Sequence, residues 1–325
     1  MGDPCGIAPE ITYKAWKTLK TQRKYCFAVI AQPEIFDYCN NKIKIITAPS
    51  EAINVFQDSL PLIPIDGHNT EKGHPNQIHT ASILESIKLA VDICAKGKAD
   101  GLVTNPISKE ILYKSGFNFP GHTEYLGEIT KEIHMINSRG PVMMLSGGGL
   151  KIALITVHVP LKKAALLITK KEIIKKAKVI NEALIKDFGI KNPRIALAGI
   201  NPHAGENGQL GQEEMEIINP AAEILRKEGI NISDALPADT LFHEEARSMY
   251  DAAIAMYHDQ GLIPVKTLDF YGGVNITLGL PIVRTSPDHG TAFNIAGKNI
   301  ARPDSLIAAI KTAREISDNR AIQNA

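Results

Sequence analysis

The stretch AAIAMYHDQG, residues 252–261, decides the fold class. An apolar run of about six residues ends at His258, which is typical of a buried strand of a parallel sheet opening into a loop. In open α/β sheets, ligands bind outside the carboxyl ends of the strands. The sequence therefore predicts an α/β protein with chemistry at His258 and Asp259.

The longer region Tyr250–Ala292 places further polar residues between apolar runs and glycines. Lys266 follows Ile-Pro-Val, Asn275 lies in GVNITLG, and Arg284 follows Pro-Ile-Val. Two cations and an amide donor suit a substrate phosphate or carboxylate. Surface solvation is the simpler alternative for each residue alone. Their apolar neighbours favour the binding role.

Two other apolar runs also lead to a histidine. KIALITV precedes His158 and IALAGINP precedes His203, and the three histidines are separated by 45 and 55 residues. Each interval is about one strand-helix-strand unit, so three parallel strands could bring three imidazoles to one sheet edge. That set, with one open position, is typical of a catalytic Zn²⁺ or Co²⁺ site. Each histidine alone would more simply be structural.

Two aspartates near these histidines are candidates for supporting chemistry. Asp239 lies in ALPADTLF beside a proline, and Asp259 directly follows His258. Either carboxylate could orient a metal-bound histidine or move a proton, and the sequence leaves both roles open.

The rest of the chain alternates strands and helices, which predicts a mostly parallel sheet. Strands are expected in FAVIAQPE, KIKIITAP and DGLVTNP, a hairpin in PVMMLSGGGLKIALITVH, and helices over Thr80–Lys96, after the Thr169 capping box, over Glu213–Lys227 with a kink at Asn219-Pro220, and from Ser305. After the turn at Pro120-Gly121, Thr123 is a plausible helix cap. A cap would not explain His122 beside it.

The glycine-rich opening GDPCGIAPE, residues 2–10, predicts a turn leading into a helix with Pro9 in its first turn. Such a turn can cradle a phosphate, or it can need glycine for conformation alone. An apolar strand is expected before it, and only Met1 precedes it. We therefore expect a truncated or misassigned N-terminus.

Composition limits the class of protein. The 325 residues are 44% hydrophobic, which suffices for a large core, and 36 basic against 35 acidic residues give a net charge near +1. We expect no nucleic-acid partner. The four cysteines form no CxxC pair, and no apolar run reaches the ~18 residues of a membrane span. These features predict a soluble cytoplasmic protein.

The motifs together resemble one family. They are GDPCGIAPE, GHTE, HVPL, GINPHAGENGQLGQEE, LPADTLF, AMYHDQG, GVNITLGLPIVRTSPDHGTA and the Ala-Gly pair at 296–297. This series is similar to the 4-hydroxythreonine-4-phosphate dehydrogenase family of pyridoxal phosphate biosynthesis, and its two ends resemble isopropylmalate and isocitrate dehydrogenases. The match runs from residue 2 to about residue 312.

The resemblance implies a fold and an assembly. Two α/β/α domains with mostly parallel sheets would flank an interdomain cleft, with residues 1–117 and 285–325 on the cofactor side and residues 118–284 holding metal, substrate and dimer contacts. The family is a homodimer that shares its sites across the interface, so His258 would serve the neighbouring subunit's site.

The resemblance also implies roles for individual residues. His158, His203 and His258 would bind one Zn²⁺, Co²⁺ or Mg²⁺. Substrate contacts would come from His122, Thr123, Lys266, Asn275 and Arg284, and the loop with His289, Gly290, Thr291, Ala292 and Asn294 would bind NAD or NADP. Asp239, Asp259 and Lys266 are the candidate catalytic residues, with Asp239 or Lys266 as the base.

The implied reaction oxidises C3 of 4-phosphooxy-L-threonine, and the 3-oxo acid then loses CO₂ to give 3-amino-2-oxopropyl phosphate. Asn294 stands where the family commonly carries an acidic residue, which leaves the choice between NAD and NADP open. Alternatives are sibling dehydrogenases of D-threonate or D-erythronate 4-phosphate or of dihydrodiol acids, a metallohydrolase, and a non-catalytic binder. HGTAFNIAG, residues 289–297, favours a dehydrogenase.

Overall fold

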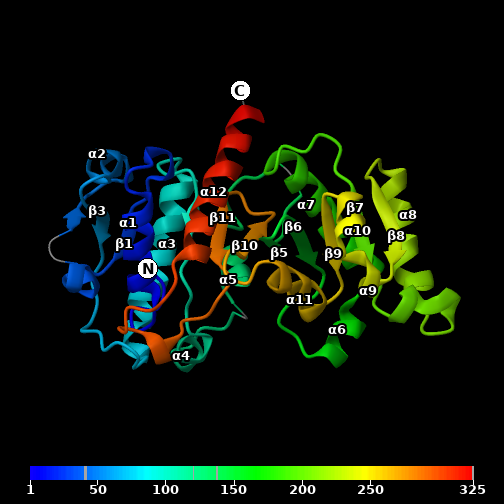
Figure 1. Cartoon of the computed structure of the whole chain (residues 1–325), viewed down its shortest axis with the longest axis horizontal. Helices are drawn as coiled ribbons and strands as arrows, with labels where there is room; N and C mark the ends of the chain where they lie inside the picture. The colour runs from blue at the N-terminus through cyan, green and yellow to red at the C-terminus, as the bar shows by residue number, and fades with distance from the viewer. Residues whose placement is uncertain (40–41, 120, 137, 324–325) are drawn as a thin grey trace. The chain divides into compact units, whose positions relative to one another are not determined.

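The computed structural model describes residues 1–39, 42–119, 121–136 and 138–323 (Figure 1). The chain divides into two compact units. Unit 1 contains Met1–Ile133 and Pro281–Ser317, and unit 2 contains His134–Leu280 and Asp318–Ala325. Each unit combines strands with helices, so the predicted α/β class is confirmed. The assignment of cofactor binding to one domain and of metal and dimer contacts to the other stays a prediction.

The first sheet of unit 1 has the order β1-β3-β2, and both pairs are parallel. Val29 and Ala31 of β1 pack in a core cluster with helix α1, whereas Ile30 packs in a second cluster with α3. Successive side chains of a strand point to opposite faces, so α1 and α3 cover opposite faces of this sheet. The bounds are α1 Ala8–Leu19, β1 Val29–Ala31, β2 Ile43–Ile45, α2 Ala52–Val55, β3 Leu60–Pro64 and α3 Thr80–Ala95.

Two further strands of unit 1 pair in parallel, with Leu102 of β4 beside Arg284 of β11. Three helices accompany them, and His122 is the first residue of α5. The bounds are β4 Leu102–Val103, α4 Lys109–Lys114, α5 His122–Ile129, β11 Arg284–Pro287 and α12 Asp304–Gln323.

Unit 2 contains strands in the order β10-β5-β6-β9-β7-β8. The pairs β10/β5 and β5/β6 are antiparallel, while β6, β9, β7 and β8 run parallel. The predicted hairpin at the glycines after β5 is therefore confirmed. The bounds are β5 Val142–Gly147, β6 Leu150–Leu154, β7 Ile195–Ala198, β8 Ile232–Leu236, β9 Ala252–Ala255 and β10 Val274–Leu278.

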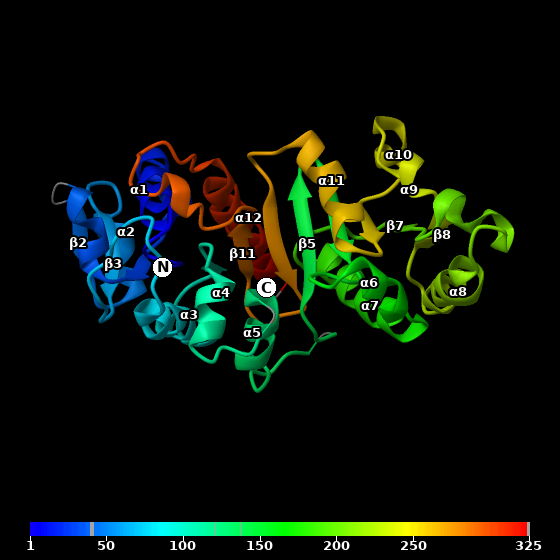
Figure 2. The same cartoon turned by 90° about the horizontal axis from the view of Figure 1, so that it is seen from below.

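Helices cover both faces of this sheet. Leu262 and Val265 of α11 pack in a cluster with alternate residues of β5, β6, β9 and β7, and Figure 2 shows α11 and α7 on opposite sides of these strands. The Thr169 hydroxyl caps α7 by accepting a hydrogen bond from the Glu172 amide at 3.2 Å. The bounds are α6 Leu161–Leu167, α7 Lys170–Lys186, α8 Asn219–Lys227, α9 Ala238–Leu241, α10 Glu244–Ser248 and α11 His258–Leu268.

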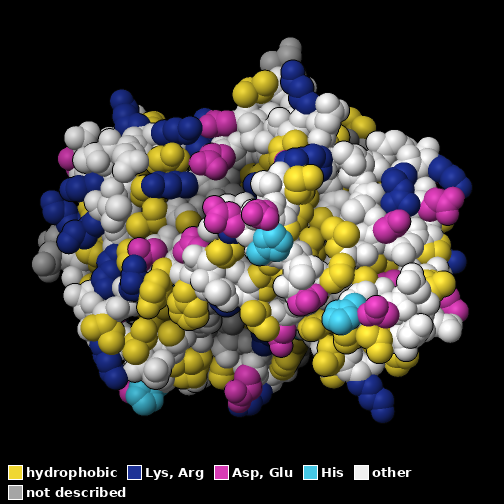
Figure 3. All heavy atoms as spheres, turned by 45° about the vertical axis from the view of Figure 1, so that its right-hand side comes forward, with side chains coloured by type: hydrophobic (Ala, Val, Ile, Leu, Met, Phe, Trp, Pro, Cys, Tyr) yellow, Lys and Arg dark blue, Asp and Glu magenta, His cyan; other side chains and the backbone are white. Residues whose placement is uncertain are grey.

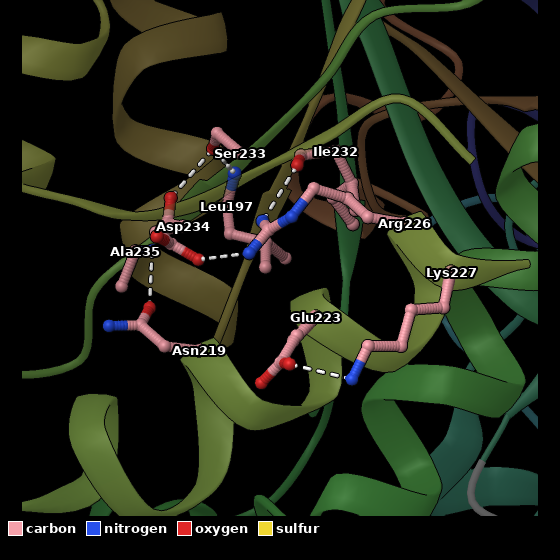
Figure 4. Close-up of polar contacts among 9 residues, drawn as sticks. All are labelled: Leu197, Asn219, Glu223, Arg226, Lys227, Ile232, Ser233, Asp234 and Ala235. Carbon is pink, nitrogen blue, oxygen red and sulfur yellow. Dashed lines mark hydrogen bonds and ion pairs between the residues drawn. The ribbon is translucent and has the colours of Figure 1, made fainter. Parts of the chain in front are cut away.

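Polar contacts fix α8 against β8, the strand that leads into the Asp239 segment (Figure 4). Arg226 donates to the Ile232 carbonyl at 3.1 Å and to Asp234 at 2.9 Å, and the Ala235 amide donates to Asn219 at 2.8 Å. A π-helical turn, Glu214–Ile218, comes directly before α8. The helix predicted over Glu213–Lys227 is thus divided into this π-helical turn and α8, which begins at Asn219; the kink at Asn219-Pro220 stays a prediction.

Three expectations need correction. Helix α5 begins at His122 with Gly121 as its N-cap and no side-chain cap bond, so Thr123 is not the cap; Pro120 of the preceding turn lies outside the described residues. Strand β3 was not predicted, because its Pro61 and Pro64 disfavour a ladder position. The three histidines do not follow their strands directly, because each lies three to five positions beyond the last residue of its strand.

No helix in the described part of the chain is long and apolar enough to span a membrane.

Candidate active-site residues

The strands that precede the three histidines are neighbours. The order is β6-β9-β7, and both pairs are parallel, so their carboxyl ends lie at one edge of the sheet of unit 2. This confirms the predicted strand arrangement. Because each histidine lies in the segment that follows its strand, the position of its side chain depends on the loop geometry as well as on the sheet.

His158 and His258 lie together at this edge. Their ring centroids are 5.6 Å apart, with an interplanar angle of 46°. The Nδ1 atom of His258 is 2.8 Å from an Asp259 carboxylate oxygen. A proton on Nδ1 donated to Asp259 leaves the Nε2 lone pair available for a metal ion or for a proton. Asp259 thus occupies the orienting position that the sequence left open.

His203 lies in the turn Pro202–Gly208, where residues 203–207 all have positive φ values. Its Nδ1 atom is 2.8 Å from Glu206, and the side chain is exposed. Buried Glu214 holds the preceding segment by accepting the amides of Ile200 and Asn201 at 2.7 and 2.8 Å. This role of Glu214 could not be predicted from the sequence, because Glu214 has the pattern of an ordinary helix residue.

The donor set of one chain fits part of a metal site. Within the described ranges, no three His, Cys, Asp or Glu side chains are grouped closely enough to hold a metal ion. The structure brings His158 and His258 together and does not add His203 to them. Two imidazoles at this separation suit a transition metal, which would need at least one more protein donor.

His203 and Asp239 instead line one surface hollow of unit 2, of about 570 Å³. Asp239 lies in the short helix α9 and is exposed. Histidine side chains adjoin acidic ones on the face drawn in Figure 3. The exposed Asp239 carboxylate is accessible from solvent in this hollow.

A cationic cluster forms in unit 1 around Arg284. This side chain is 2% exposed and donates to the Thr104 hydroxyl at 2.7 Å. Burial lowers the pKa of Arg284 to about 10. A guanidinium held in such a place suits a bidentate contact with phosphate or carboxylate.

His122 and Lys109 belong to the same cluster. Burial, followed by the charges of Arg284, the chain's amino terminus and Lys109, holds the pKa of His122 well below its usual range. Burial also lowers the pKa of Lys109. The charges of Arg284 and Lys109 disfavour a charge on His122, whereas the Glu124 carboxylate favours the charges of Lys109 and Arg284. Thr123 is buried beside His122. Lys109 was missed, because Ser-Lys-Glu reads as a plain helix start.

Lys266 and Asn275 belong to unit 2. Lys266 lies on α11 with its ammonium 5.5 Å from the centroid of the Phe270 ring. The Asn275 side-chain oxygen on β10 is buried and has no hydrogen-bond partner among the residues described. A buried amide oxygen without a partner indicates a place for a donor from a ligand or water.

The predicted cofactor loop packs on the glycine-rich opening turn. The Ile7 amide donates to the Thr291 carbonyl at 3.0 Å, and a Cβ at Gly6 would lie 2.6 Å from that oxygen. His289 Nδ1 is 3.0 Å from the Gly290 carbonyl, Ala292 is left-handed with a φ of 46°, and Asn294 is exposed. Close backbone packing therefore explains Gly6.

Helix α1 anchors the far end of this loop. Glu10 accepts the Ala301 amide at 2.8 Å, and the Lys14 ammonium donates to the Asn299 and Ala301 carbonyls at 2.9 and 2.8 Å. Neither residue was singled out by its sequence. Both stand at ordinary helix positions, so only the tertiary contacts show their role.

The mixed α/β architecture with mostly parallel strands is that of a dehydrogenase fold of the isocitrate and isopropylmalate dehydrogenase type. More specifically, the chain belongs to the family described as pyridoxal phosphate biosynthetic protein PdxA, whose model matches residues 20–313. The predicted family is thereby confirmed. The protein is an oxidoreductase, and membership implies a nicotinamide cofactor and a small-molecule substrate.

Individual relatives agree with this family. A 4-hydroxythreonine-4-phosphate dehydrogenase of Caulobacter vibrioides is 51% identical over 99% of this chain and 97% of its own length. The crystal structure of the Klebsiella pneumoniae enzyme of that name is 33% identical, with a TM-score of 0.82 and 98% of each chain covered. A terephthalate 1,2-cis-dihydrodiol dehydrogenase of Burkholderia xenovorans is 25% identical, with a TM-score of 0.63 and coverage of 97% and 96%.

Proposed function

We propose that this protein oxidises 4-phosphooxy-L-threonine at C3 with a nicotinamide cofactor, in pyridoxal phosphate biosynthesis. The observation that carries the proposal is the 51% identity to a dehydrogenase of this substrate along almost the whole chain. The buried Arg284 with His122 beside it supports a phosphorylated substrate, because a buried guanidinium forms strong charge-assisted hydrogen bonds with a phosphate.

The chemistry requires the removal of one hydride and one proton. The hydride leaves C3 for the nicotinamide, and the proton of the C3 hydroxyl leaves for a base, for which Asp239 and Lys266 are the candidates. The resulting 3-oxo acid loses CO₂ to give 3-amino-2-oxopropyl phosphate. Arg284, His122 and Thr123 would hold the phosphate, while Lys266 and Asn275 would contact the rest of the substrate.

His158, His203 and His258 are the proposed ligands of one divalent ion, Zn²⁺, Co²⁺ or Mg²⁺. Such an ion supplies Lewis-acid stabilisation of negative charge on the substrate oxygen. Asp259 fixes the ring of His258, which supports this assignment. A homodimer with shared sites would supply the third imidazole that one chain does not bring to the pair.

The loop at residues 289–297 is the proposed site of the nucleotide. Asn294 carries no charge and would not repel a 2′-phosphate, so both NAD and NADP are candidates. Four free cysteines support the proposed cytoplasmic location, because disulfides are rare in that reducing compartment.

An assay of cofactor reduction tests the proposal. The purified protein with Zn²⁺, Co²⁺ or Mg²⁺ should reduce NAD or NADP when 4-phosphooxy-L-threonine is added. D-threonate 4-phosphate and D-erythronate 4-phosphate serve as the competing substrates. Reduction with one of these two and none with 4-phosphooxy-L-threonine would assign the protein to a sibling activity.

A further inference from the structure

Side-chain hydrogen bonds join the three segments that carry the histidines of unit 2. The Thr156 hydroxyl donates to the Met256 carbonyl at 2.7 Å. The side-chain oxygen of Gln260 accepts the Met256 amide at 2.7 Å, and its side-chain nitrogen donates to the Gly199 carbonyl at 2.6 Å. Thr156, Met256 and Gly199 lie one or two residues beyond the ends of β6, β9 and β7. Gln260 therefore connects the segment after β9 with the segment after β7.

The segment after β9 is held from two sides. The Met256 carbonyl also accepts the Thr156 amide at 3.2 Å, while Gln260 takes up the Met256 amide. Both polar groups of this backbone unit are thus bonded, and the Met256 side chain is buried. The path of the chain into His258, two residues further on, is fixed by these contacts.

The contact at Gly199 bears on the turn that carries His203. A Cβ at Gly199 would lie 3.0 Å from the Cα of Ala204, so the turn packs directly against this residue. The Gly199 amide donates to the Leu236 carbonyl at 2.8 Å, and Glu214 accepts the next two amides of the chain. A shift of the Gly199 carbonyl would therefore move the His203 turn.

Helix capping is the simpler explanation for Gln260, because this residue lies in the first turn of α11. A cap would explain the bond from the Met256 amide. It would not explain the bond to Gly199, which lies 61 residues earlier and follows another strand. The two bonds together need one acceptor and one donor on the same side chain. A glutamine amide supplies both, whereas a glutamate carboxylate only accepts.

We propose that Gln260 is a positioning residue, which holds the segment that carries His258 and the turn that carries His203 at a fixed separation. The inference rests on the proposed function, in which both histidines bind a divalent ion. Both segments need fixed positions whether that ion takes its ligands from one chain or from two. Loss of a group that orients metal ligands commonly lowers metal affinity about 10-fold to 100-fold.

The first test is hydrogen exchange in the metal-free protein. In Gln260→Met both bonds are lost, so the Met256 amide and the amides of residues 200 and 201 should exchange about tenfold faster. Glutamate still accepts the Met256 amide, so in Gln260→Glu only residues 200 and 201 should exchange faster. Gln57→Leu is the control, because Gln57 is exposed. Wild-type exchange at residues 200 and 201 in Gln260→Glu would reduce Gln260 to a helix cap and overturn the proposal. If Gln260→Met does not fold, Gln260→Glu alone decides.

The second test measures Co²⁺ affinity from its visible absorbance, together with kcat and KM in the cofactor-reduction assay. We expect Gln260→Met to weaken Co²⁺ binding about tenfold and to lower kcat by a similar factor. The KM for the cofactor should not change, because the proposed nucleotide loop lies in unit 1. Wild-type Co²⁺ affinity and kcat in Gln260→Met would contradict the proposal. A wild type that binds Co²⁺ and does not oxidise 4-phosphooxy-L-threonine would contradict the proposed function instead, and the Co²⁺ affinities would still decide the role of Gln260.

Discussion

At the scale of single residues, we expect substrate recognition to depend most on Arg284. It is almost fully buried, and Thr104 fixes one of its nitrogens. A buried cation that has given up solvation binds an anion more strongly than an exposed cation does. The phosphate of the substrate is the group that this residue would select.

We expect Arg284→Lys to raise KM for the phosphorylated substrate by about tenfold or more, because one ammonium cannot reproduce the fork of donors. Arg194→Lys is the matched control, since Arg194 is an exposed arginine paired with Asp251. Steady-state kinetics of both variants provide the measurement. An unchanged KM in Arg284→Lys would remove Arg284 from the phosphate site.

His122 should make stability depend on pH. Its pKa lies well below 6.5 in the folded chain, so below pH 6.5 the unfolded chain binds a proton that the folded chain does not. The free energy of unfolding therefore falls as the pH falls through 6.5. Asp3 has the opposite effect on the free energy of unfolding, because burial raises its pKa from 3.8 to about 6. Since Asp3 is present in every variant compared, it does not contribute to the difference between them.

We expect His122→Gln to flatten the decline in the free energy of unfolding between about pH 7.5 and about pH 5.5. Urea unfolding at a series of pH values measures it, with His74→Gln as the control because His74 is exposed. Parallel pH profiles for wild type and His122→Gln would show that the folded chain does not lower the pKa of His122.

The sequence revealed some of these residues and not others. His122, Asn275 and Arg284 could be found because polar side chains in apolar surroundings require a reason. Lys109, Glu10 and Lys14 could not, since a charged residue on a helix usually faces solvent. Their partners lie at distant points of the chain, such as Asn299 for Lys14.

At the scale of elements, α1 supports the loop at residues 289–297, the proposed nucleotide site, and is also part of the core. Trp16 and Leu19 pack inward on one face of the helix. Glu10 and Lys14 bind the residues that close the loop. The position of the loop is therefore tied to a buried helix.

We expect Lys14→Met to raise KM for the nicotinamide cofactor by about threefold to tenfold with little change in kcat, since two hydrogen bonds to the loop are lost. Lys17→Met, on the exposed side of the same helix, is the matched control. Initial rates at varied cofactor concentration measure the effect. Equal cofactor KM values in the two variants would show that α1 does not hold the loop for binding.

Element types were predictable where periodicity was strong. Helices α3 and α7 have clear apolar stripes, and the capping residue Thr169 marks where α7 begins. The two prolines of β3 disfavour a strand, so this element was not predictable from its sequence. It is nevertheless the central strand of its sheet, because it pairs with both β1 and β2. The backbone of residues 203–207 is left-handed throughout. Apart from Gly205, the residue types in this turn did not predict that conformation.

At the scale of the whole molecule, sharing of the metal site between subunits would explain why one chain groups two histidines and not three. A C2 dimer contains two equivalent sites, each built from both chains. Loss of different ligands from the two chains would then leave one complete site in a heterodimer. This arrangement can be tested directly.

We expect His203→Ala and His258→Ala each to lose bound metal and turnover while His134→Ala retains both. Mixing, unfolding and refolding the two inactive variants together should restore about a quarter of wild-type activity, because half of the dimers would carry one intact site. Turnover and metal content per chain provide the measurement. No recovery in the mixture would place His203 and His258 in the site of one chain.

The stoichiometry of the products identifies the reaction. With 4-phosphooxy-L-threonine, NAD or NADP and a divalent metal, we expect one reduced cofactor, one CO₂ and one 3-amino-2-oxopropyl phosphate for each substrate consumed. Turnover of this substrate without cofactor reduction, or cofactor reduction without CO₂ and the amino ketone, would contradict it.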